Sequence, residues 1–377
     1  MRNHPLAAFV GSVTAAIAAV VVIPVPLLAQ TPAVKKPATP YVAPRTADGH
    51  ADLQGVYDVA TMTPVERPNG ANLILTEKEA AALEQYEADR QVKNDAPLKG
   101  DREAPPVGGD TSPTKSYLEV LERAGGGVVG GYNNFWLAGG TKMIIVDGQK
   151  RSSLVVDPID GRVPAMKPEA RRRNAAFLAG AVSPDAAEGA AAGPPGAFDG
   201  PEVRPLAERC LLGFGSTSGP PTLPNYFYNN LKQIVQTPTS VMILNEMVHD
   251  ARVIRIGGPH LPPTIRKWMG DSVAHWDGDS LVIDTTNFTN KTQFRGSSDQ
   301  LHVIERLTRT GPGTLLYRFT VEDPQTWDSA WSGEYPWNAT AENLYEYACH
   351  EGNYSLGGML RGARAREAED AAKSGKQ

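Results

Sequence analysis

The chain is poor in cysteine, with only two in 377 residues, and it carries no excess of basic residues. Two cysteines cannot supply a four-cysteine zinc site, and a formal net charge of −5 argues against a nucleic-acid-binding surface. The P-loop, HExxH and Gly-x-Ser-x-Gly motifs are absent. A glycine-rich run at 125–131 is not followed by a helix opening, so it indicates a turn and not a phosphate-binding loop. No motif therefore points to a nucleotide, metalloprotease or serine-hydrolase site.

Only the N-terminal segment is continuously apolar. A positively charged start precedes residues 6–22, which are rich in Ala and Val, and Pro24 and Pro26 end any helix. Ala29 offers a small residue for cleavage. The pattern predicts a signal peptide over residues 1–29, with a membrane anchor as the alternative. We therefore expect a periplasmic or secreted bacterial protein that meets the membrane only through its export signal.

Cys210 and Cys349 would then lie in a compartment where disulfides persist. A bridge between them would close a loop of about 140 residues and would restrict the unfolded chain. The sequence predicts this bridge, with two buried free thiols as the alternative.

Composition divides the rest of the chain. Residues 30–50 are rich in Pro, Ala and Lys and are predicted to be a disordered lead-in. Residues 51–361 are predicted to form a single β-rich domain, because 37 glycines and 31 prolines indicate many turns. An Ala-, Gly- and Pro-rich insertion interrupts this domain at about 172–205. Residues 362–377 are charged and are predicted to be a frayed C-terminal tail.

Alternating aliphatic and polar residues predict strands joined by tight turns. Thr76 and Glu79 form a capping box that predicts a short helix. The fold class is mainly β: an antiparallel up-and-down barrel with a few short peripheral helices and long loops, or, as the alternative, a β-sandwich. The predicted strands are 241–247 paired with 252–256, 273–276 paired with 280–284 around Asp277-Gly278, 302–310 paired with 314–322, and a last strand at 344–349.

Eight short motifs extend over nearly the whole chain after the leader. They are Gln54-Gly55-Val56-Tyr57, Tyr132-Asn133-Asn134-Phe135-Trp136, Ser153-Leu154-Val155-Val156-Asp157-Pro158, Glu208-Arg209-Cys210, Gly270-Asp271-Ser272, the run from Asp279 to Phe288, Asp323-Pro324, and the run from Tyr345 to Asn353. Together they resemble a large family of exported bacterial proteins of sphingomonads and acidobacteria, and this resemblance implies no established activity. Gly55-Val56-Tyr57 also resembles the Gly-x-Trp that opens lipocalin-like (calycin) barrels, with Tyr57 in place of Trp. That resemblance implies an up-and-down barrel with an apolar ligand cavity.

His249 and Asp250 lie at the tip of a predicted hairpin. A carboxylate beside an imidazole can orient it and make it a general base near neutral pH, although a solvated turn would use the same residues. Glu305 occupies an inward position among aliphatic neighbours. We expect it to be either a catalytic acid or one half of a buried ion pair with Arg255 or Arg318.

Five of the seven histidines and five of the six tryptophans lie between residues 241 and 350, so we expect the site there. Paired His or Cys spacings are absent, and neither a metal nor an organic cofactor is predicted. The expected function is cofactor-free acid–base catalysis (lyase, isomerase or hydrolase) on a small apolar or aromatic molecule. The alternative is a non-catalytic periplasmic protein that binds such a ligand and is functionally linked to an outer-membrane transporter. Predicted catalytic residues are His249, Asp250 and Glu305, and predicted substrate-binding residues are Glu246, Arg252, His275, Trp276, Tyr317 and Phe319.

Overall fold

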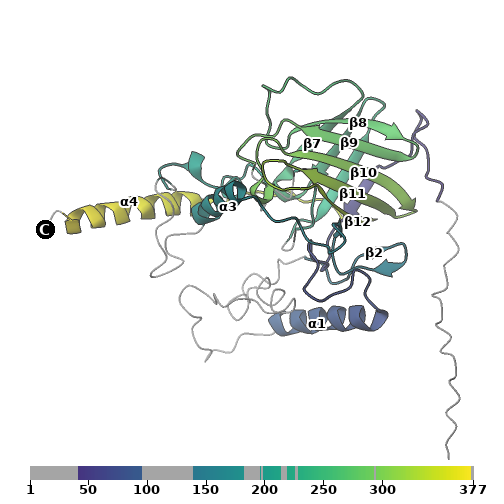
Figure 1. Cartoon of the computed structure of the whole chain (residues 1–377), viewed down its shortest axis with the longest axis horizontal. Helices are drawn as coiled ribbons and strands as arrows, with labels where there is room; N and C mark the ends of the chain where they lie inside the picture. The colour runs from purple at the N-terminus through teal and green to yellow at the C-terminus, as the bar shows by residue number, and fades with distance from the viewer. Residues whose placement is uncertain are drawn as a thin grey trace, which may run out of the picture. The chain divides into compact units, whose positions relative to one another are not determined.

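The computed structural model describes residues 41–95, 139–181, 196, 198–213, 219–225, 228–292 and 294–374. The predicted signal peptide, most of the predicted lead-in and part of the predicted insertion lie outside these residues. The helices and strands, drawn in Figure 1, are β1 (Gly55–Asp58), α1 (Glu77–Asp95), β2 (Ile145–Val146), β3 (Gln149–Lys150), β4 (Val155–Asp157), α3 (Pro168–Ala181), β5 (Leu231–Gln236), β6 (Ser240–Asn245), β7 (Ala251–Ile256), β8 (Asp271–Asp277), β9 (Ser280–Thr286), β10 (His302–Gly311), β11 (Thr314–Glu322), β12 (Trp331–Ala339) and α4 (Tyr354–Ser374).

Nine strands close into a barrel. Their order is β1, β5, β6, β7, β8, β9, β10, β11, β12, and β12 pairs back onto β1 through Ala339 opposite Tyr57. The short strand β4 adds to β12 outside this ring. Figure 1 shows β7 to β12 side by side in the barrel wall. Closure pairs both sides of each strand of the ring, which removes free strand edges. The predicted barrel is therefore confirmed, and the β-sandwich is not the architecture.

The strand directions depart from those of an up-and-down barrel at one junction. β7 and β8 pair in parallel, with Arg255 opposite Val273 and Ile256 opposite Ala274. Parallel neighbours require a crossover connection, which residues 257–270 provide. The expected antiparallel pairing is wrong at this junction, whereas every other neighbouring pair of the ring is antiparallel.

The three predicted hairpins correspond to β6–β7, β8–β9 and β10–β11. The two-residue turn of β8–β9 is Gly278-Asp279, one residue later than predicted. The predicted strand at 344–349 is wrong, because the last strand is β12, which contains Pro336. β12 places Trp331, Tyr335 and Trp337 in the barrel, so its period-2 aromatic pattern was a usable signal.

Apolar and aromatic side chains fill the barrel around Tyr317. The Tyr317 ring stacks on Trp337 at 5.0 Å between centroids and meets Tyr335 edge-on at 5.4 Å. A Cβ at Gly333 would lie 2.4 Å from the Phe319 ring, so glycine at this position lets that ring pack inside. This part of the interior is occupied by rings, and it does not form the apolar ligand cavity that the lipocalin-like resemblance implies.

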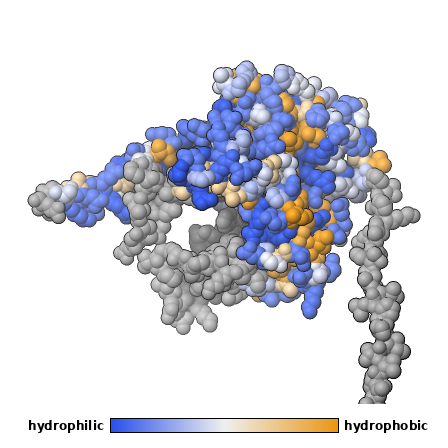
Figure 2. Space-filling view, in the orientation of Figure 1, coloured by the Kyte–Doolittle hydropathy of each residue, from blue (hydrophilic) through white to orange (hydrophobic). Residues whose placement is uncertain are grey.

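The helices lie outside the ring of strands. At the start of α1, the Thr76 hydroxyl accepts from the Glu79 backbone N–H at 3.2 Å, and Glu79 accepts from the Thr76 N–H at 2.8 Å. The predicted capping box is confirmed. In the described part of the chain, none of the helices combines the length and the apolar character that a membrane crossing requires. In the view of Figure 2, hydrophilic residues cover most of the described surface.

Candidate functional site

The turn that joins β6 to β7 has an unusual backbone. We call residues 246–250 the β6–β7 turn. Val248 and His249 are consecutive residues with positive φ, at 61° and 45°. This left-handed region is uncommon for residues other than glycine and is unfavourable for a β-branched side chain. Each such residue costs on the order of 1–3 kcal/mol and is often found at a functional site. The backbone therefore marks this turn as a candidate site.

The His249 imidazole is exposed, but a backbone carbonyl fixes one of its nitrogens. Nδ1 lies 3.1 Å from the Tyr347 carbonyl oxygen. A carbonyl only accepts, so we assign the proton to Nδ1, which leaves the Nε2 lone pair available as a base. Asp250, expected to orient this imidazole, forms no hydrogen bond with it. The orienting group is the Tyr347 carbonyl.

The disulfide holds the segment that braces this turn. Cys210 and Cys349 are bonded, with their Cα atoms 5.7 Å apart, as predicted from the sequence. Cys349 lies two residues after the carbonyl that fixes His249. In the same segment, the Tyr345 backbone N–H donates to Glu246 Oε1 at 3.0 Å. Residues 345–349 therefore contact both ends of the β6–β7 turn, and the disulfide anchors them.

Lys232 is the least expected member of the site. It points into the barrel from β5 and is 0% exposed. Its Nζ has no hydrogen-bond partner among the described residues. Burial lowers the pKa of Lys232 to about 8, against the opposing attraction of Glu246, Asp250 and Asp58. Sequence reasoning missed this lysine, although the alternation of β5, which also turns Ile234 inward, would have predicted its direction.

Asp250 is shifted in the opposite sense. Burial raises the pKa of Asp250 to about 6, although the positive charges of His249 and Lys232 oppose the rise. Its Oδ2 is buried and makes no hydrogen bond within the described part of the chain. An amine and a carboxyl group with pKa values moved toward neutrality, next to an imidazole, are typical of an acid–base site. We call Lys232, Glu246, His249 and Asp250 the turn cluster.

Glu305 belongs to a different arrangement. Its carboxylate is fully buried and receives two hydrogen bonds from Arg252, at 2.5 and 2.8 Å. The Tyr317 hydroxyl donates to the same carboxylate at 2.7 Å. The expectation of a buried ion pair is confirmed, but the expected partners were wrong. Arg255 pairs with Asp271, and Arg318 pairs with Glu334.

The ion pair engages three of the predicted site residues. With its carboxylate bound to Arg252 and Tyr317, Glu305 is saturated by protein groups, and the same contacts occupy the other two side chains. The Tyr317 hydroxyl also accepts from the Thr222 backbone N–H at 2.8 Å. These three residues tie β7, β10 and β11 together across the barrel, and three hydrogen bonds hold the Glu305 carboxylate.

The remaining predicted binding residues lie elsewhere. His275 is exposed on β8. Trp276, at the β8–β9 end of the barrel, stacks on His50 with 4.7 Å between ring centroids. Phe319 packs inside the barrel, edge-on to Trp331. The structure therefore divides the predicted site into two groups. Glu246, His249 and Asp250 lie at the β6–β7 turn, whereas Arg252, Glu305 and Tyr317 meet inside the barrel.

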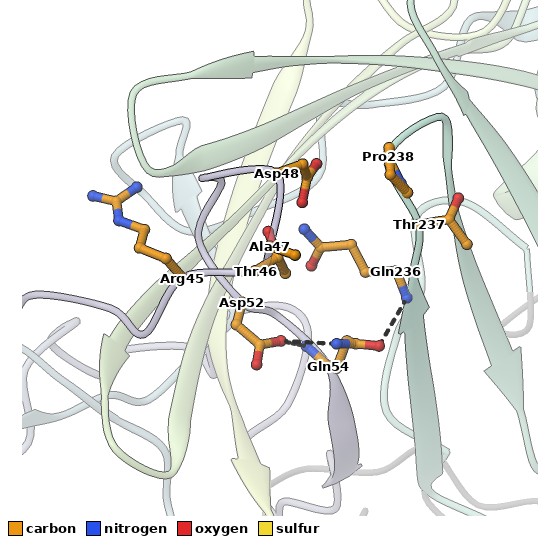
Figure 3. A pocket seen from close by; sticks show the side chains of 9 residues that line it. All are labelled: Arg45, Thr46, Ala47, Asp48, Asp52, Gln54, Gln236, Thr237 and Pro238. Atoms are coloured by element: carbon orange, nitrogen blue, oxygen red, sulfur yellow. Dashed lines mark hydrogen bonds between the residues drawn. The ribbon is translucent and has the colours of Figure 1, made fainter.

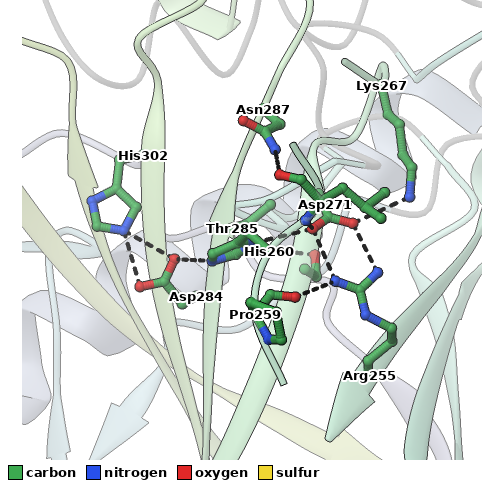
Figure 4. Close-up of polar contacts among 11 residues, drawn as sticks. Arg255, Pro259, His260, Lys267, Asp271, Asp284, Thr285, Asn287 and His302 are labelled. Carbon is green, nitrogen blue, oxygen red and sulfur yellow. Dashed lines mark hydrogen bonds and ion pairs between the residues drawn. The ribbon is translucent and has the colours of Figure 1, made fainter. Parts of the chain in front are cut away.

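A second polar group lies on the outer face of the barrel, where Figure 4 shows two imidazoles on either side of Asp284. His260 Nε2 lies 3.0 Å and His302 Nε2 3.2 Å from this carboxylate. The Nδ1 atoms face two further carboxylates, Asp271 at 3.2 Å and Glu322 at 3.3 Å. We call these five residues the imidazole–carboxylate chain.

Charge pairing stabilises the charged forms of Asp271 and His302 in the imidazole–carboxylate chain. Although burial alone would raise it, the pKa of Asp271 is held well below its usual range by hydrogen bonds from Arg255 and the Leu261 N–H. The hydrogen bond to Asp284 raises the pKa of His302. The alternation of β10 places His302 on the face opposite Glu305, but its partner does not follow from local sequence. Asp284 lies opposite the residue two positions after His302 on β10. Its contact with His302 is therefore diagonal, and predicting it requires knowledge of the strand register.

A polar pocket of about 390 Å³ lies at the other end of β5 from Lys232. Figure 3 shows its lining side chains, which come from the segment before β1 and from the β5–β6 turn. None of them belongs to the predicted site. They are Arg45, Thr46, Ala47, Asp48, Asp52, Gln54, Gln236, Thr237 and Pro238.

Comparisons of the chain with protein-family models, with curated proteins and with solved structures give no match. Within the described residues, no group of three or more His, Cys, Asp or Glu side chains is arranged to hold a metal ion.

Proposed function

We propose that the protein is an exported enzyme that performs acid–base catalysis at the turn cluster, without an organic cofactor, on a small apolar or aromatic molecule. The proposal rests on two buried atoms without hydrogen-bond partners among the described residues, Lys232 Nζ and Asp250 Oδ2, together with the strained backbone of His249. Proteins rarely bury polar atoms without partners, because each costs stability, and exceptions are often found at functional sites. Export is supported by the disulfide, which suits an oxidising compartment.

Each residue has a distinct role in this proposal. His249 Nε2 removes a proton from the substrate, with the Tyr347 carbonyl holding the tautomer. Asp250, with its pKa of about 6, returns a proton to the product. Lys232 supplies a positive charge where negative charge develops. Lyase, isomerase and ester-hydrolysis reactions can all use this pairing of base and acid.

The imidazole–carboxylate chain is less suited to this role. Both nitrogens of His260 and of His302 already face carboxylates. Carboxylates therefore occupy the ring nitrogens that a general base would need free, and the hydrogen bond to Asp284 also raises the pKa of His302. His249, by contrast, makes no hydrogen bond through Nε2 to the described residues.

The test is turnover of a panel of small carbonyl compounds, esters and epoxides by the mature, disulfide-bonded protein. Deuterium uptake from D2O and product formation are followed by NMR. We expect His249→Gln and Asp250→Asn each to lower kcat by about 100-fold or more, as for loss of a general acid or base. His275→Gln is the matched control, because His275 is an exposed barrel histidine outside the turn cluster. Equal rates for all four proteins would refute the proposal.

A second candidate is non-catalytic binding of a small ligand in the pocket beside Gln236. Its volume of about 390 Å³ falls in the range of small-molecule sites. Its lining is polar, so it favours a polar ligand over the apolar one expected from the sequence. Native mass spectrometry of the protein purified from the periplasm would detect a retained ligand. Loss of that ligand in Gln236→Ala, with retention in Asp250→Asn, would favour this candidate.

A further inference from the structure

Lys232 differs from the lysines that form ion pairs in the described part of the chain. Five lysines have carboxylate oxygens within 4 Å of Nζ, and all five are partly or largely exposed: Lys142, Lys150, Lys167, Lys267 and Lys373. Lys232 is 0% exposed, and its Nζ has neither a hydrogen-bond partner nor an ion-pair partner among the described residues. A lysine that served only to neutralise Glu246 or Asp250 would be expected to touch them.

A purely structural role is a poor account of this geometry. A buried ammonium without direct partners destabilises the fold, and an apolar side chain of similar volume would remove that cost. A buried amine that is readily deprotonated is, however, what nucleophilic lysine chemistry requires, because only the neutral amine attacks a carbonyl carbon.

We propose that Lys232 is a nucleophile that forms an imine with a small aldehyde or ketone, which makes carbonyl compounds the substrate class of the turn cluster. This inference rests on the proposed acid–base function and deepens it. The amine attacks in its neutral form, and the imine nitrogen, once protonated, carries the positive charge that Lys232 supplies in that function. An imine withdraws electrons from the adjacent carbon, so the base of the site then removes an α-hydrogen more easily than from the free carbonyl compound.

The step balances with the groups of the cluster. The Lys232 nitrogen adds to the carbonyl carbon, and one amine proton moves to the carbonyl oxygen to give a carbinolamine. A carboxyl group then protonates the hydroxyl, the C–O bond breaks, and water leaves as the C=N bond forms. We assign this proton transfer to Asp250, since it has an unpartnered buried oxygen and its charge attracts that of Lys232. No oxidant or reductant is consumed.

Imine formation requires a route to Lys232, and we assign this route to the β6–β7 turn. The Glu246 backbone N–H donates to the Leu231 carbonyl at 3.0 Å, so this turn is fastened to β5 at the residue before Lys232. The same turn contains the two left-handed residues Val248 and His249. A carbonyl compound reaches the amine when this contact opens, and the strained backbone makes opening less costly than for a regular turn.

The test is reductive trapping at pH 8. The mature protein is mixed with acetaldehyde or benzaldehyde and sodium cyanoborohydride for a short pulse, and peptide mass spectrometry measures the alkylated fraction of each lysine. Near pH 8 the Lys232 amine is about half neutral, whereas an ordinary lysine with a pKa near 10.4 is almost fully protonated. We expect the adduct on Lys232 to exceed that on Lys142, whose side chain is 76% exposed, by at least about tenfold.

Two variants define the result. Lys232→Met should lose the dominant adduct, and Asp250→Asn should slow its formation while leaving the Lys142 adduct unchanged. Should Asp250→Asn fail to fold, the pH profile of wild-type labelling serves instead, with Lys232 labelling rising through about pH 8. Alkylation of exposed lysines with Lys232 unmodified would overturn the proposal.

The outcome is separable from that of the proposed function. If His249→Gln and Asp250→Asn abolish turnover but Lys232 is never trapped, acid–base catalysis stands and the imine fails. If Lys232 is trapped but His249→Gln leaves turnover unchanged, the nucleophile stands and the assigned base fails.

Discussion

Replacing Lys232 by methionine should stabilise the protein while removing its activity. On folding, the pKa of this lysine falls from the ordinary 10.5 to about 8, chiefly because the ammonium loses its water. At pH 7 such a shift costs the folded state on the order of 3 kcal/mol relative to a neutral side chain. Methionine fills a similar volume without a charge. We therefore expect Lys232→Met to raise the free energy of unfolding by about 1–4 kcal/mol at pH 7.

The stability difference between wild type and Lys232→Met should change with pH in a defined direction. Between about pH 8 and 10.5 the folded protein binds fewer protons at Lys232 than the unfolded chain does. Wild-type stability should therefore rise with pH across this window, relative to the variant. Below pH 8 the difference between the two proteins should be constant, because the amine is then protonated in both states.

This difference can be measured by urea unfolding of the disulfide-bonded proteins, followed by tryptophan fluorescence. Trp327, Trp331 and Trp337 are buried, so their fluorescence reports the barrel core. An unchanged m-value would show that the variant unfolds from an equally compact state. Lys142→Met is the control and should change stability by less than about 0.5 kcal/mol, because its side chain is largely exposed. The reasoning is refuted if Lys232→Met is less stable than wild type by the same amount at every pH.

Three further predictions follow from the contacts of the barrel and its outer face. Breaking the buried pair by Arg252→Met or Glu305→Leu alone should cost about 3–5 kcal/mol, whereas the double replacement should cost much less than the sum; additive costs in urea unfolding would contradict a direct pair. His302→Gln should flatten the pH dependence of stability. The raised pKa of His302 in the folded protein contributes stability that is complete below about pH 6.5 and is lost as pH rises through the folded pKa. Unchanged melting curves between pH 5 and 8 would count against this contribution. Cys349→Ser should lower stability by about 2–5 kcal/mol and should also lower turnover, because the bridge anchors the segment that fixes His249; a stability loss with unaltered kcat would separate the disulfide from the site.

The sequence correctly predicted those structural features that depend on residues close together in the chain. The hairpin around His249, the capping box at Thr76 and the inward direction of Glu305 all follow from alternation and turn chemistry within about ten residues. The prediction failed at β12, where Pro336 concealed a strand whose alternate residues are aromatic. It also failed at the parallel β7–β8 junction, because strand periodicity is the same for parallel and antiparallel neighbours.

The site was only partly accessible from sequence for the same reason. Glu246, His249 and Asp250 lie in one short turn, so the sequence already placed them near one another, but Lys232 joins them through pairing of β5 with β6. The partner of Glu305 depended on which arginine points inward from a strand on the other side of the barrel. Alternation alone could not decide among several arginines that lie on different strands.

The sequence by itself determined the β-rich architecture, the strong hairpins, the cysteine pair and the ionisable turn at His249-Asp250. Each of these depends on residue type and on local spacing, which the chain carries in any fold. Only the tertiary structure decided that Lys232 is buried without a partner, that Arg252 neutralises Glu305, and that His260 and His302 share Asp284. These contacts join residues 18 to 53 positions apart or depend on complete burial, and both are set by strand register and barrel closure rather than by any local pattern.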